Sequence, residues 1–219
     1  MKNIFLFCFA LFVVFGLVIR YAVLQTPKHM QSKIVENKNK TITEIYSTDQ
    51  APSKTMRANI ASMSGQVQWQ SRTATQPAAL ALVSPIQFQQ GETIITPKKS
   101  SITLKFPNDS TAVLFPETHL YLFQTLPDNL VFNQSAGTVE YTNITSTALA
   151  VRSLSLLVQL NAATATISIE KNSPFITVHV KNGAVKAAFN DADQVSMVFD
   201  IPPGKTVEFN NDEKKAELQ

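Results

Sequence analysis

Cysteine is almost absent from this sequence of 219 residues, and the single one, Cys8, lies in an apolar stretch near the N-terminus. One cysteine excludes an intramolecular disulfide and a metal site built from cysteines. A folded domain in this chain must therefore be held together by its hydrophobic core. The apolar content of 44% is ordinary for a globular protein, so such a core is feasible.

Charged residues are also sparse, at 16% of the chain, and the basic ones are not gathered on the region that looks globular. Residues 58–219 hold 11 Lys and Arg against 13 Asp and Glu, whereas residues 25–57 hold six basic and three acidic side chains. A nucleic-acid-binding protein concentrates Lys and Arg on the folded domain itself. This distribution argues against nucleic acid as a partner.

One long apolar run is present. Residues 4–24 contain a single charge, Arg20, and have about the length that a helix needs to cross a bilayer. Arg20 and Tyr21 come near the end of the run, where both side chains suit the lipid headgroup region. A cleaved signal peptide is the alternative, but the run is long for one and no pair of small residues follows it. We therefore expect residues 1–3 to be a short tail, residues 4–24 to be a signal anchor in the lipid bilayer, and residues 25–57 to be a polar, flexible stalk.

The charges around this run do not settle which side of the membrane the rest of the chain occupies. Four lysines follow it, which by the positive-inside rule indicates a cytoplasmic C-terminal part. Long domains, however, can be translocated largely regardless of charge.

Beyond the apolar run the pattern is that of short β-strands, with no useful stretch of helical periodicity. Apolar and polar residues alternate with a period of two, most clearly in residues 102–106 and 175–181. Turn signals separate such segments, and Asn182-Gly183 is the strongest hairpin dipeptide. Further strands are expected at residues 65–70, 111–115, 119–123, 130–132, 136–141, 154–160, 165–169, 184–189, 195–201 and 206–209.

About twelve short strands at a spacing of about ten residues are typical of an all-β domain, namely a β-sandwich, a jelly roll or a short β-solenoid. We expect this domain to cover residues 58–210. Residues 211–219 are rich in charge, and we expect them to be a disordered tail.

The sequence contains no convincing catalytic or metal-binding group. His29, His119 and His179 are scattered, and His119 and His179 alternate with apolar neighbours, so they should point away from the core. Asp191 and Asp193 could hold Ca²⁺, and Asp109 with Glu117 could form an acid–base pair, although all four lie in turn signals, where such residues are common. We therefore expect no catalytic residue, no metal and no cofactor, and we expect that the protein is not an enzyme.

The order of several glycine-containing elements resembles the FecR domain family of bacterial membrane-associated proteins. The resemblance covers residues 60–210. The matching elements are Gly65-Gln66-Val67, residues 91–96, residues 104–116, Gly137-Thr138-Val139, Gly183-Ala184-Val185 and Pro203-Gly204-Lys205. The sequence departs from the family at Asn108-Asp109, where Asp-Gly is usual, and at Ala163-Thr164, where Gly-Thr is usual.

The resemblance implies a membrane-anchored β domain outside the cytoplasm that takes part in signalling as a sensor or a binding scaffold, with a protein or a cell-envelope polymer as its partner. Family members that regulate sigma factors carry a cytoplasmic segment before the membrane helix. Because only three residues precede residue 4, we expect no contact with a sigma factor by that route. The alternative is an LptC-like lipid-transport bridge, which also joins one N-terminal helix to a jelly roll and would need an apolar groove between open sheet edges.

Overall fold

Fourteen strands make up the regular structure of the computed structural model, which describes residues 55–80 and 86–219, all within the compact unit Asp49–Gln219. The strands are β1 (Asn59–Ser64), β2 (Gln68–Gln70), β3 (Ala78–Ala79), β4 (Thr93–Thr96), β5 (Ser101–Lys105), β6 (Thr111–Leu114), β7 (Thr118–Leu126), β8 (Asn129–Asn143), β9 (Leu149–Ser153), β10 (Leu156–Ile169), β11 (Phe175–Asn190), β12 (Ser196–Ile201), β13 (Thr206–Asn210) and β14 (Lys215–Leu218). These described residues contain no helix, and therefore none that could span a bilayer. The expected all-β class is confirmed, whereas the expected anchor at residues 4–24 and nearly all of the expected stalk lie outside the described residues.

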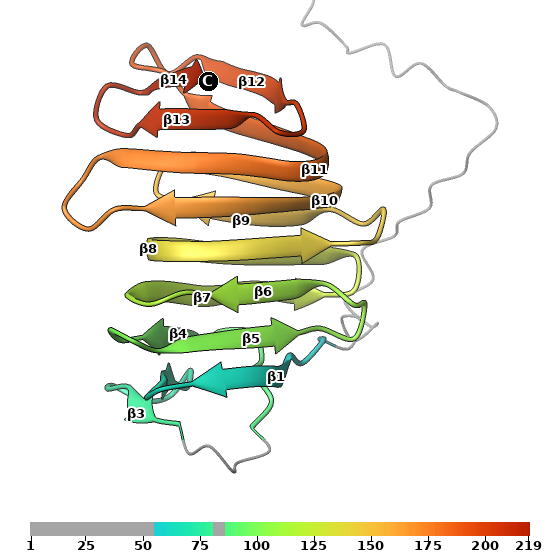
Figure 1. Cartoon of the computed structure of the whole chain (residues 1–219), viewed down its shortest axis with the longest axis vertical. Coiled ribbons are helices and arrows are strands. Elements are labelled where there is room, and N and C mark those ends of the chain that lie inside the picture. The colour runs from blue at the N-terminus through green and yellow to red at the C-terminus, as the bar shows by residue number, and fades with distance from the viewer. Residues whose placement is uncertain (1–54, 81–85) are drawn as a thin grey trace, which may run out of the picture. The chain divides into compact units, whose positions relative to one another are not determined.

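The strands form one hydrogen-bonded sheet that doubles back to make two layers. We call sheet I the layer of β1, β5, β6, the C-terminal half of β8, the C-terminal half of β10, the N-terminal half of β11, β13 and β14. Sheet II contains β3, β2, β4, β7, the remaining halves of β8, β10 and β11, and also β9 and β12. Figure 1 shows the strands stacked like rungs, from β1 and β3 at one end to β12, β13 and β14 at the other. All pairings are antiparallel except that of β8 with β9.

Three long strands bend to pass from one layer to the other. Gly137 in β8, Ala162 in β10 and Gly183 in β11 have φ angles of +80°, +44° and +81°. Positive φ reverses the local curvature of a strand, which is the geometry of a bulge or corner. At Gly183 a side chain would also overlap the carbonyl oxygen of Ala162 on the neighbouring strand, so this close approach of two backbones requires glycine.

Aromatic side chains join the two layers. Phe132 of sheet II packs against Phe106, just after β5 of sheet I, with ring centroids 5.5 Å apart, and it stacks on Tyr141 of sheet I at the same separation. Near β12 and β14, Phe189 of sheet II meets Phe209 of sheet I at 4.8 Å. Each buried phenylalanine contributes roughly 1.5–3 kcal/mol from the area it removes from water. The interior is thus filled by side chains from both layers.

The prediction of a hairpin at Asn182-Gly183 was wrong. The structure continues through both residues as β11, with Val178 paired to Val207 in sheet I and Ala187 paired to Phe199 in sheet II. Positive φ at glycine suits either a tight turn or a strand corner, and the sequence does not distinguish the two.

The prediction of a disordered tail at residues 211–219 was also wrong. Residues 215–218 form β14 and pair with β13. Ala216 and Leu218 alternate with Lys215 and Glu217, so the period-two pattern of a strand is present beneath the charge. Pairs of expected strands merge into β8, β10 and β11, and β1 and β9 had no counterpart among the strands expected from the sequence.

We predict that Gly183→Ala destabilises the protein far more than Gly204→Ala. Both glycines have positive φ, but an added Cβ meets backbone only at Gly183 and has open space at Gly204. The expected loss in the free energy of unfolding is about 1–2 kcal/mol for Gly204→Ala, which is the cost of the left-handed conformation alone. For Gly183→Ala we expect about 3 kcal/mol or more, because the two backbones must also separate. Denaturant unfolding followed by circular dichroism measures both, and equal losses would contradict the corner at Gly183.

Candidate functional site

The histidines singled out by sequence lie far from one another in the fold. His119 is on β7 in sheet II and His179 is on β11 in sheet I, each with buried neighbours in its strand. Partial burial lowers the pKa of His119, so its ring is neutral at pH 7. His179 Nδ1 is hydrogen-bonded to Thr206 Oγ1 at 3.0 Å. Within the described residues no group of three His, Cys, Asp or Glu side chains could hold a metal ion, and His29 lies outside them.

The acidic residues singled out by sequence lie in turns and loops. Asp191 Oδ1 accepts the backbone N–H groups of Asp193 and Val195, each at 2.9 Å, in the loop between β11 and β12. Asp109 precedes β6 and pairs with Lys105 at 2.9 Å, whereas Glu117 follows β6. The carboxylates of Asp109 and Glu117 therefore lie at opposite ends of a strand and do not converge.

A buried polar network links β8 to β10 inside the core. The Gln134 side-chain amide donates to the carbonyls of Gly137 and Ile167, at 2.9 and 3.1 Å. The Tyr141 hydroxyl donates to Gln134 Oε1 at 3.1 Å. Desolvation raises the pKa of Tyr141 well above its usual value of 10, so the phenol stays neutral and serves the fold.

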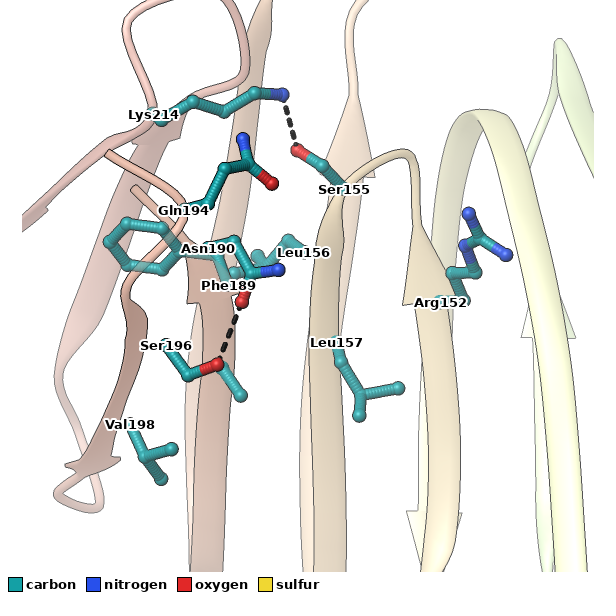
Figure 2. A pocket seen from close by; sticks show the side chains of 11 residues that line it. Arg152, Ser155, Leu156, Leu157, Phe189, Asn190, Gln194, Ser196, Val198 and Lys214 are labelled. Carbon is teal, nitrogen blue, oxygen red and sulfur yellow. Dashed lines mark hydrogen bonds between the residues drawn. The ribbon is translucent and has the colours of Figure 1, made fainter. Parts of the chain in front are cut away.

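A pocket lies at the end of the β domain formed by β9 to β12 and the turn before β14, and Figure 2 shows it from close by. Its volume is about 570 Å³. It is lined by Arg152, Ser155, Leu156, Leu157, Ala188, Phe189, Asn190, Gln194, Ser196, Val198 and Lys214. We call it the terminal pocket.

Strand register explains how residues distant in sequence meet in the terminal pocket. Arg152 of β9 pairs with Leu157 of β10, Leu157 pairs with Ala188 of β11, and Ala188 pairs with Val198 of β12. These four side chains form one row across the outer face of sheet II. Leu157 and Val198 are exposed, so the row presents an apolar floor to solvent with a guanidinium at one end.

The charge of the terminal pocket is positive and uncompensated. No acidic side chain lines it, and neither Arg152 nor Lys214 takes part in an ion pair within the described part of the chain. Lys214 Nζ donates to Ser155 Oγ at 2.8 Å, as Figure 2 shows. Ser155 Oγ donates in turn to Asn211 Oδ1 at 2.6 Å, and these bonds hold the ammonium group at the rim. An apolar floor between two cations suits a ligand that carries both apolar and anionic groups.

A second hollow of about 440 Å³ lies beside the turn between β6 and β7. Lys98, Lys171, Glu117 and His119 line it. Glu117 Oε1 lies 4.0 Å from Lys98 Nζ. Because this carboxylate offsets the charge of the lysine, the hollow is a weaker anion site than the terminal pocket.

Sequence reasoning missed the terminal pocket altogether. None of its residues was singled out, since each looks ordinary in its own strand. The one available signal was that Leu157 lies between Leu156 and Val158, which are buried. In a strand, a residue between two core positions faces solvent, so an apolar side chain there is exposed.

Comparisons with known proteins give a likeness of fold. Neither a protein-family model nor a curated protein sequence matches the chain. Two crystal structures of a candidate anti-sigma factor from Parabacteroides distasonis, at 2.50 and 1.65 Å resolution, are similar to it with a TM-score of 0.51 and 14% sequence identity. In each case the match spans 58% of this chain and 58% of the other. The likeness is one of fold alone.

We predict that Tyr141→Phe lowers the free energy of unfolding by about 1–3 kcal/mol, because it leaves buried Gln134 Oε1 without a donor. Tyr121→Phe is the matched control: Tyr121 lies in sheet II and is only partly buried, so its change should stay within about 0.5 kcal/mol. Thermal or denaturant unfolding of both variants checks this. A loss at Tyr141 no greater than at Tyr121 would show that the hydroxyl bond does not stabilise the core.

Proposed function

We propose that this protein is a membrane-anchored, FecR-like β domain that works outside the cytoplasm as a sensor or binding scaffold without catalysis. Its partner is a protein or a cell-envelope polymer, and the terminal pocket binds an anionic segment of that partner. The observation that carries the proposal is the pocket itself, which combines two unpaired cations with an apolar floor.

The chemistry of the terminal pocket supports binding over catalysis. Its hydroxyls belong to Ser155 and Ser196, and they are hydrogen-bonded to the side-chain oxygens of Asn211 and Asn190. An amide oxygen is no general base, and a nucleophilic serine needs a base within hydrogen-bond reach. Arg152 and Lys214, by contrast, are suited to carboxylate or phosphate groups.

The filled interior also favours this proposal over an LptC-like lipid bridge. A bridge needs an apolar groove between the two layers that is wide enough for an acyl chain. Here Phe106, Phe132 and Tyr141 occupy that space as a contiguous stack, and each is buried. The terminal pocket, in contrast, opens on the outer face of sheet II.

We predict that reversing the two pocket charges abolishes capture of the partner. A photo-crosslinking amino acid at Leu157 in the full chain should capture a partner from intact membranes. Adding Arg152→Glu and Lys214→Glu should lower the yield about tenfold or more, since each charge-assisted contact is worth about 1.5–3 kcal/mol. Immunoblotting of the crosslinked product measures the yield.

Lys205→Glu supplies the matched control, because Lys205 is exposed in the turn between β12 and β13 and does not line the pocket. The control should keep the wild-type yield. An equal loss in all variants, or a product that survives both pocket reversals, would contradict a role for the pocket. Capture of cytoplasmic proteins alone would overturn the proposed compartment.

Protease protection in spheroplasts tests the orientation separately. The proposal predicts that added protease degrades the β domain while the spheroplast membrane is intact. Protection until the membrane is lysed would place the domain in the cytoplasm and contradict the proposal.

A further inference from the structure

Within the described part of the chain, two strand edges are free at the end of the β domain that holds the terminal pocket. Among the described residues, β12 pairs only with β11 and β14 pairs only with β13. Apolar side chains lie exposed beside these edges, namely Val195, Met197 and Leu218. An exposed strand edge with apolar neighbours is a template for pairing with another strand.

The hydrogen-bond pattern shows which backbone groups are free. The N–H of Asp191 donates to the carbonyl of Val195, and by alternation the N–H and C=O groups of Ser196, Val198 and Asp200 face away from β11. Thr206 and Gln219 exchange both bonds, which leaves Ala216 as the central residue of β14 with its polar groups facing outward.

We propose that a second copy of this chain docks at this end, so that β12 pairs with β12 and β14 pairs with β14, both antiparallel, about one two-fold axis. Such an interface is isologous, since the same surface serves both partners. The inference goes beyond the proposed function and stands without it.

Both strands are self-complementary in the registers that the free groups allow. Antiparallel pairing centred on Val198 sets Met197 opposite Phe199 and Ser196 opposite Asp200. A centre on Asp200 would oppose two like charges, which is unfavourable. Pairing of β14 centred on Ala216 sets Lys215 of each copy opposite Glu217 of the other, which gives two favourable cross-strand ion pairs.

A single axis can serve both pairs of strands. Met197 is paired with Phe189 in sheet II, and Ala216 is paired with Phe209 in sheet I. The rings of Phe189 and Phe209 are in contact, with centroids 4.8 Å apart. Met197, next to Val198, and Ala216 therefore lie across from each other at the end of the two layers. Docking buries Met197 and Leu218, and it places the two terminal pockets on one continuous sheet face.

Crosslinking through a cysteine at the axis tests the proposal in the full chain, in membranes. On a Cys8→Ser background, Val198→Cys should give a product at twice the chain mass with a bismaleimide, because residues opposed across a strand pair lie only about 5.5 Å apart. Ile144→Cys is the matched control, since Val198 is 68% exposed and Ile144 is 61% exposed but Ile144 lies in the loop after β8. Equal yields at the two positions, or a product of Val198→Cys with another protein only, would overturn the proposal.

Charge reversal tests the register of β14. In the Val198→Cys chain, Lys215→Glu or Glu217→Lys alone should lower the yield about fivefold, because like charges then meet twice across the axis. Combining both changes in one chain, or mixing the two singly changed chains, should restore the yield. Glu217 faces Glu208 within the chain, so Glu217→Lys removes an internal repulsion and should not unfold the domain. Failure of either combination to restore crosslinking would contradict the paired register.

Discussion

Backbone hydrogen bonding runs without a break between the two layers, because β8, β10 and β11 belong to both. This continuity requires a residue at positive φ in each of the three strands, a conformation that only glycine adopts at little cost. Because the three strands are continuous, one set of strand registers fixes both layers. A shift of one residue in any long strand would exchange buried and exposed side chains in both sheets, so the alternation of apolar residues and the three corners reinforce each other.

The terminal pocket follows from the same constraint. Its row of side chains comes from four strands, and two of these, β10 and β11, carry the corners at Ala162 and Gly183. The corners set where the second layer begins and thus which residues of β10 and β11 face β9 and β12. The free edges of β12 and β14 lie beyond β11, the last strand that belongs to both sheets. At this end, within the described residues, β12 is the edge strand of sheet II and β14 is the edge strand of sheet I, and each has a single partner.

The sequence predicted the class of fold and many of its strands because period-two alternation is a local signal. It is plain in Ile176, Val178 and Val180, and all three are buried. The errors lie where one local signal fits two structures: Asn182-Gly183 suits a hairpin and a corner alike, and the charges of residues 211–219 hid the strand pattern of β14. The terminal pocket was not predictable, because register across strands far apart in sequence decides which side chains meet. Polar residues that stood out in the sequence, such as Asp109 and Asp191, turned out to hold turns.

The bend of β11 at Gly183 distinguishes the two-layered arrangement from a simple series of hairpins, and NMR contacts of Ala187 test it most directly. The two-layered account predicts that Ala187 contacts Val158 and Phe199, its partners in sheet II, and that Val178 has a separate set of strand partners in sheet I. Cross-strand backbone contacts between Val178 and Ala187, as in a hairpin closed at Asn182-Gly183, would contradict the corner, the shared registers and the terminal pocket together.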